Sequence, residues 1–104
     1  MAQREEIQLN YRKTLRQADE LERMAVQLIS LSEREGENAV QGIQNAWHGD
    51  NAAYYCRKGE RLILRIKQHG ETLKRTAQVL RRAAKNTYSA EMRSIEIAER
   101  RKYR

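Results

Sequence analysis

Only a few residues of this chain are of types that could perform chemistry. The candidates for a nucleophile or a metal ligand are Cys56, His48 and His69. Cys56 does not stand at the spacing of a zinc motif, and a site at either histidine would need further donors converging on it. No Ser-His-Asp arrangement, phosphate-binding glycine loop or isolated carboxylate pair is present. We therefore predict that the chain is not an enzyme and holds neither a metal nor a cofactor.

Structural roles explain the same residues better. His48 is expected to be a solvated turn residue and His69 a hydrogen-bonded residue of a helix core. Cys56 is interpreted as a small, partly buried apolar side chain, with a cross-link between two copies as the alternative. Two readings of Trp47 remain open: it is a recognition element, or it packs on the apolar stripe and holds the turn in place.

The composition indicates how such residues would be positioned. The 104 residues include no Pro, no Phe and only five Gly, while Lys, Arg, Glu, Gln, Ala and Leu dominate. This composition favours long helices and leaves little from which to build strands. A chain of this length is expected to form one domain, residues 1–104. We therefore predict an all-α fold.

Two stretches show a sustained helical period. The first helix is expected over about 4–46, with small residues recurring every seven positions: Ala18, Ala25, Ser32, Ala39 and Ala46. The second is expected over about 51–97, followed by a basic tail, 98–104. Its predicted contact stripe is Gly59, Leu62, Ile66, His69, Leu73, Thr76, Leu80, Ala83 and Thr87, widened by Ile63, Gly70, Ala77 and Ala84. Gly36 and Gly42 suggest a local kink in the first helix.

Trp47-His48-Gly49 lies between the two stretches, in a turn expected over 47–50. Gly49 can adopt the left-handed conformation that ends a helix, and Asp50 or Asn51 can cap the next one. The chain should therefore reverse here and form an antiparallel hairpin. Because two helices enclose no complete core, the hairpin is expected to dimerise into a four-helix bundle with the small residues of the first helix at the dimer seam. Ala25→Leu and Ala39→Leu should then both disrupt association.

With the Trp47-His48-Gly49 turn at mid-chain between two amphipathic helices, the sequence resembles the WXG family of early-secreted-antigen-like bacterial proteins. The resemblance covers about Tyr11 to Ile95. It implies a dimeric four-helix bundle that is exported by a type VII secretion system with a membrane ATPase. The protein would act by protein–protein interaction, as a secreted substrate or as a targeting partner for a larger effector. Its partners would be a second copy or a related WXG-like or effector helical domain, and also the ATPase.

The C-terminal region departs from the export signal of that family, which is a Tyr followed four residues later by Asp or Glu. Met92 stands four residues after Tyr88, and the acidic residue, Glu91, comes one position early. Tyr88 and Glu91 thus form a degenerate export signal, and the alternative is that a partner carries the signal. The N-terminus has no apolar segment of a signal peptide and no stretch is long enough to span a membrane. Synthesis in the cytoplasm without a cleavable signal peptide, followed by secretion, is expected.

The charge is unevenly distributed along the chain. Residues 1–46 carry six Lys and Arg and eight Asp and Glu, a net −2, whereas residues 47–104 carry fifteen and six, a net +9. A basic second helix is the basis of the alternative function, a helical nucleic-acid-binding protein whose affinity would fall steeply with salt. The cations are spread around the helix without interleaved aromatics to stack on bases, which favours a solvated face complementary to an acidic partner.

Overall fold

The protein is described by a computed structural model that covers residues 2–102. All of these residues are helical except 47–49, and the predicted all-α class is confirmed. The elements are α1 (Ala2–Leu31), a π-helical turn η1 (Ser32–Gly36), α2 (Glu37–Ala46) and α3 (Asp50–Lys102). In place of the predicted basic tail from residue 98, α3 continues to Lys102. Its last turn holds Arg100, Arg101 and Lys102, whose positive charges suit the negative end of a helix dipole.

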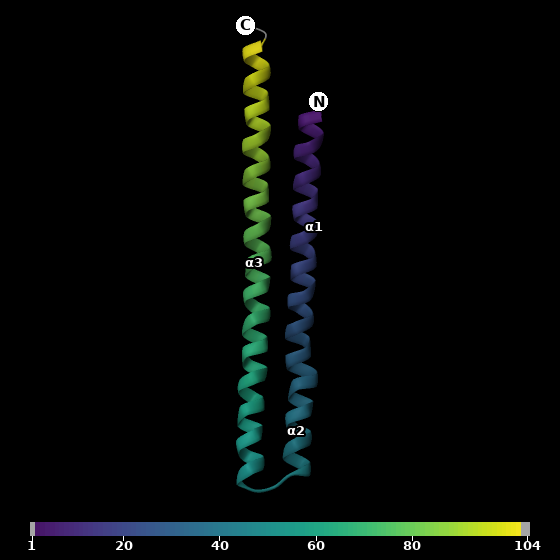
Figure 1. The fold of residues 1–104 in the computed structure, drawn as a ribbon, viewed down its shortest axis with the longest axis vertical. Coiled ribbons are helices and arrows are strands. Elements are labelled where there is room, and N and C mark those ends of the chain that lie inside the picture. Colours follow the sequence, from purple (N-terminus) through teal and green to yellow (C-terminus); the bar gives the residue numbers. More distant parts are fainter. Residues whose placement is uncertain (1, 103–104) are drawn as a thin grey trace. The chain divides into compact units, whose positions relative to one another are not determined.

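The chain divides into two compact units, which we describe separately. Unit 1 consists of residues 2–21 and 76–102, and unit 2 consists of residues 22–75. In each unit, a segment from the first half of the chain packs against an antiparallel segment of α3 (Figure 1). The expectation of one domain over residues 1–104 stays a prediction.

Unit 2 is a helical hairpin whose turn is at residues 47–49, at the bottom of Figure 1. Trp47 ends α2 in an extended conformation, and its N–H donates to the carbonyl of Ile43 at 2.9 Å. Gly49 has φ +106°, a value that L side chains rarely adopt, and this confirms the reversal predicted at this glycine. Its carbonyl accepts the first helical bond of α3, from the N–H of Ala53 at 3.1 Å. Gly49 therefore occupies the position before α3 where a cap from Asp50 or Asn51 was expected, and Asp50 lies in the first turn.

The helices of unit 2 approach closely at Gly70. A Cβ atom built on Gly70 would lie 2.6 Å from Cγ1 of Ile29 and 3.1 Å from the backbone oxygen of Ala25. Since the second neighbour is backbone, it cannot move aside as a flexible side chain could. Gly70 thus serves close helix packing, and the helix tolerates its low propensity for that reason.

This contact predicts opposite effects for two glycine substitutions. Gly70→Ala is expected to destabilise the protein because overpacking at a helix contact costs about 1–3 kcal/mol, more than the helix propensity it gains. Gly42→Ala is the control, since a Cβ there meets nothing within 4 Å. It should stabilise the protein by about 0.5–1 kcal/mol. Urea unfolding followed by circular dichroism measures both, and a stabilised Gly70→Ala variant would contradict the close approach.

Unit 1 is held by a small core and by ion pairs at its surface. Ile7, Ala18 and Ala77 are buried, and the rings of Tyr11 and Tyr88 meet edge to face with centroids 4.7 Å apart. Exposed ion pairs join the segments, among them Arg81 to Asp19 at 2.7 Å and Arg4 to Glu99 at 2.8 Å. Surface pairs of this kind contribute little, about 0–1 kcal/mol each, so burial of small and apolar side chains is the main source of stability.

Candidate partner-binding surface

The small-residue column of the first helix lies in the contact between helices of the same chain. Ala18 and Ala25 are 0% exposed and Ser32 is 1% exposed. The Ser32 hydroxyl is satisfied, because it donates to the carbonyl of Ile29 at 2.7 Å. These three residues have no surface left for a second copy. The prediction that these three residues form the seam between two copies is therefore wrong. They form the contact between two helical segments of the same chain.

The last two residues of the predicted seam lie elsewhere. Ala39 and Ala46 are exposed, and Val40 is buried in place of Ala39. The cause is η1, since a π-turn adds one residue to the helical repeat. The buried positions therefore run from Ser32 to Val40, eight residues instead of seven. We expected at most a kink near Gly36, and the structure has a shift of register.

The contact stripe of α3 also differs from the prediction by one column. Gly59, Ile66, Leu73 and Leu80 face the contact as expected, but their partner column is the one of Ile63, Gly70, Ala77 and Ala84. Consequently Leu62, His69, Thr76 and Ala83 are exposed. Thr87, the next residue in the column of Gly59 and Leu80, is exposed as well. His69 is thus not a core residue. Cys56, which belongs to the buried column, is buried as expected, with Sγ 4.0 Å from the carbonyl oxygen of Val40.

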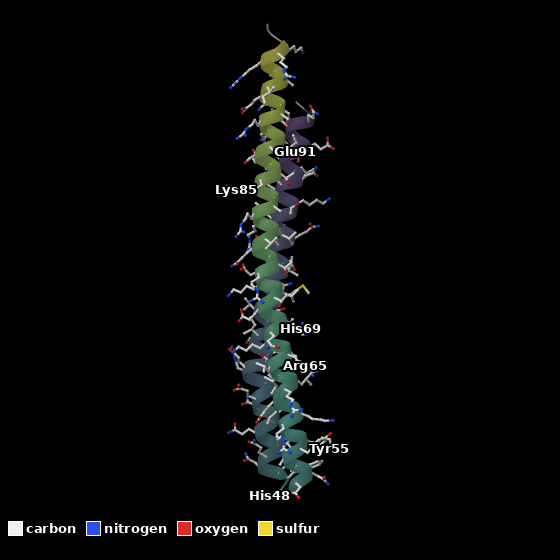
Figure 2. All side chains as sticks on the ribbon, turned by 90° about the vertical axis from the view of Figure 1, so that its left-hand side faces the viewer. His48, Tyr55, Arg65, His69, Lys85 and Glu91 are labelled. Atoms are coloured by element: carbon white, nitrogen blue, oxygen red, sulfur yellow. The ribbon has the colours of Figure 1, made fainter. Side chains whose placement is uncertain are left out.

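These two shifts leave an uncharged column on each helix beside the contact stripe. On the first helix it contains Gln3, Asn10, Gln17, Met24, Leu31, Ala39 and Ala46. On α3 it contains Tyr55, Leu62, His69, Thr76, Ala83, Ala90 and Ile97. All fourteen side chains are exposed, and none is charged at pH 7 when His69 is neutral. Figure 2 labels Tyr55 and His69 along α3.

Within each unit the two columns lie on the same side, which we call the uncharged flank. In unit 1, Asn10 and Ala83 line one hollow. In unit 2, Glu37 and Gln41 line a shallow depression together with Glu60. That depression marks the opposite, charged side, where Lys67 also pairs with Glu33 at 3.2 Å. Helical geometry then places the uncharged columns of unit 2 on the other side of the contact.

The uncharged flank differs in character between the units. In unit 2 it carries large apolar side chains: Met24, Leu31, Tyr55 and Leu62 are 44 to 57% exposed. In unit 1 it consists mostly of small or polar residues, such as Gln17, Ala83 and Ala90. A line of exposed large apolar groups is the usual mark of an interaction surface. The flank of unit 2 is therefore the better candidate for hydrophobic docking.

An aromatic cluster extends this surface at the turn. Trp47 is 57% exposed, and its ring meets that of Tyr55 with centroids 6.3 Å apart. Tyr55 contacts Tyr54 in turn, and the ammonium of Lys58 lies 4.7 Å from the centre of the Tyr54 ring. Since most of the indole is in solvent, Trp47 contributes little to the core. Of the two readings left open for Trp47, this exposure favours recognition.

Tyr88 and Glu91 are brought together with α1 in unit 1. Tyr88 is half-buried against Tyr11, and Glu91 lines the same hollow as both tyrosines. The ring of Tyr88 is therefore partly covered, and the degenerate export signal of Tyr88 and Glu91 stays a prediction. Tyr103 and Arg104, the last two residues of the predicted basic tail, lie outside the described residues.

Residues 2–102 contain no group of three or more His, Cys, Asp or Glu that could hold a metal ion. Within the same residues, no helix combines the length and the apolar character needed to cross a bilayer. The fold and the uncharged flank together define a class of protein: helical proteins in which antiparallel segments pack in pairs and one uncharged side of each pair is exposed. Comparisons with family models, with curated proteins and with solved structures returned no match.

Proposed function

We propose that this chain is a WXG-like helical protein of a type VII secretion system, acting as a secreted substrate or as an adaptor for a larger effector. Its means of action is protein–protein interaction, and a four-helix bundle with a second helical pair is the assembly that would cover the uncharged flank. The observation that carries the proposal is that flank, with its large apolar side chains exposed in unit 2.

The position of Trp47 supports the same proposal. The indole is exposed directly beside a left-handed Gly49, between two helices, as the resemblance to the WXG family would require. It adjoins the apolar flank through Tyr55. One continuous surface would thus present both the partner contact and the turn motif.

Export is the direct test of this function. The protein should accumulate in the culture medium of its host, and this accumulation should be lost in a strain lacking the type VII membrane ATPase. A non-secreted cytosolic protein, followed in parallel, controls for lysis. Retention of the protein in the cells of both strains would contradict the substrate role.

A second measurement distinguishes the adaptor role from the nucleic-acid-binding alternative. An adaptor should co-purify from the host with one helical partner, and the complex should persist at high salt because its contact is uncharged. Binding to DNA or RNA would instead weaken steeply as salt rises, since phosphate contacts release counterions. Strong salt-dependent binding to nucleic acid without such a complex would favour the alternative.

A further inference from the structure

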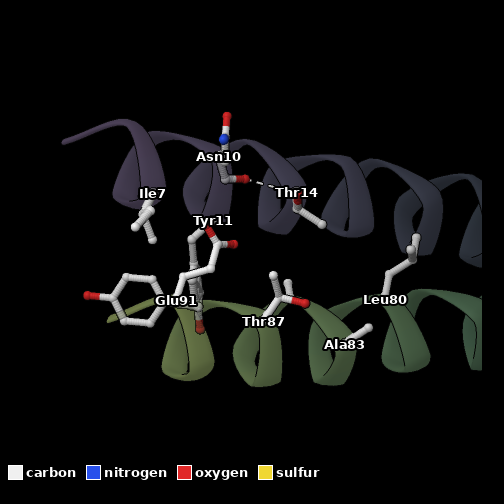
Figure 3. Close-up of a pocket in the computed structure, with 10 residues that line it drawn as sticks. Ile7, Asn10, Tyr11, Thr14, Leu80, Ala83, Thr87 and Glu91 are labelled. Atoms are coloured by element: carbon white, nitrogen blue, oxygen red, sulfur yellow. Dashed lines mark hydrogen bonds between the residues drawn. The ribbon is translucent and has the colours of Figure 1, made fainter. Parts of the chain in front are cut away.

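Unit 1 contains a hollow whose lining combines three kinds of chemistry. Its volume is about 220 Å³, and it lies between residues 7–14 of α1 and residues 80–91 of α3. Apolar side chains, among them Ile7, Leu80 and Ala84, contribute to its wall. Figure 3 shows Glu91 rising from α3 toward α1 beside Tyr11. The hollow opens on the uncharged flank, because Asn10 and Ala83 belong to both.

Glu91 is the one charged residue among the ten that line this hollow. The rings of Tyr11 and Tyr88 stand in the same wall, and aromatic faces attract cations. A carboxylate, two aromatic rings and an apolar wall together suit a cationic group on an aliphatic stem, as in arginine and lysine.

We propose that this hollow receives an arginine or lysine side chain from the helix of a partner protein. The partner helix would lie along the uncharged flank of unit 1, where Ala83 and Ala90 permit a close approach, and its cationic side chain would enter as a knob enters a hole. The ammonium or guanidinium group would then meet Glu91. That the cation comes from a partner helix rests on the proposed function, whereas the chemistry of the hollow does not.

The chemistry can be tested on the full-length protein with a small cation. Benzamidine carries an amidinium on an aromatic ring, and benzamide is its neutral counterpart of nearly the same shape. In an NMR titration, benzamidine should shift the methyl signals of Ala83 and Ala84 and bind about tenfold more tightly than benzamide, as charge-assisted hydrogen bonds are stronger than neutral ones. Equal affinities, or no binding of benzamidine, would overturn the proposal.

Substitutions test whether benzamidine binds in the hollow. Glu91→Gln should weaken benzamidine binding about tenfold and leave benzamide unaffected. Glu96→Gln is the matched control, because it removes the same charge from α3 outside the hollow. Ala83→Leu should block both ligands, and since Ala83 is exposed, the larger side chain should not disturb the fold. An equal loss in Glu91→Gln and Glu96→Gln would show only a general charge effect and would refute the site.

The partner is tested separately from the hollow. Once the protein is isolated with its helical partner, Glu91→Lys should weaken that complex more than Glu96→Lys does. A hollow that binds benzamidine, in a protein that is neither exported nor isolated with a helical partner, would leave the site intact and remove the proposed function. Equal effects of Glu91→Lys and Glu96→Lys on the complex would overturn the role assigned to the partner.

Discussion

Ala25→Leu should destabilise the hairpin of unit 2 strongly, whereas Ala39→Leu should leave its stability almost unchanged. Ala25 is 0% exposed, and its backbone oxygen lies in the close contact with Gly70. A leucine there must force the helices apart, at a cost of about 1–3 kcal/mol. Ala39 is exposed, and surface substitutions change stability by about 0.5 kcal/mol or less. Urea denaturation of both variants, followed by circular dichroism, measures the difference.

The pair is informative because the two alanines stand fourteen residues apart in the same heptad column of the sequence. Without η1 they would share one environment, and both variants would lose stability together. Equal losses would therefore contradict the register shift. The proposed function adds a second expectation, since Ala39 lies on the uncharged flank. Ala39→Leu should alter association with a partner while the fold stays intact.

Trp47→Ala is expected to abolish or greatly reduce export, or delivery of a partner, while the helices remain folded. Trp47 is 57% exposed, so removal of its side chain costs little buried surface, and the turn depends on Gly49. The amount of protein in the medium and the helical signal in circular dichroism are the two measurements. His48→Ala, at the next position of the turn, is the matched control and should be exported normally. A large loss of helicity in Trp47→Ala would make the tryptophan structural.

Trp47→Phe separates the two possible reasons for a loss of export. If a partner recognises an aromatic surface made with Tyr55, phenylalanine should restore part of the export, because it keeps a ring at that position. If the indole N–H is needed as a hydrogen-bond donor, phenylalanine should behave like alanine. Either result would agree with recognition of the exposed side chain at position 47 by a partner. Normal export of Trp47→Ala would contradict the recognition role.

The two helical stretches and the turn at Gly49 were predictable, because composition, hydrophobic period and a glycine followed by Asp50 point to the same arrangement. The register of the contact was not. On α3, Leu62 and Ile63 stand in adjacent uncharged columns, so periodicity allowed either to face the contact. The small size of Gly70, Ala77 and Ala84 was the usable signal, since small residues on one helix match those on a closely packed neighbour.

The candidate site could be predicted only in part. Trp47 stood out in the sequence, but the uncharged flank did not, because it depends on which column is buried and on the π-turn at Ser32–Gly36. The helical period of the sequence does not predict an extra residue within a continuous helix. The hollow in unit 1 was missed for another reason. It joins Tyr11 to Tyr88 and Glu91, and this pairing arises only when two distant segments meet.

The π-turn also changes the direction in which the residues after it point around the helix axis. Each residue of an α-helix advances by about 100°, so one extra residue turns everything that follows by about that amount around the helix axis. The stretch between Ser32 and Trp47 thus sets the direction in which the aromatic end of unit 2 faces. Insertion or loss of a single residue there would act as a rotation of the recognition surface while the helix itself continued. The number of residues in this short stretch, more than their identity, would then decide which partner the turn can bind.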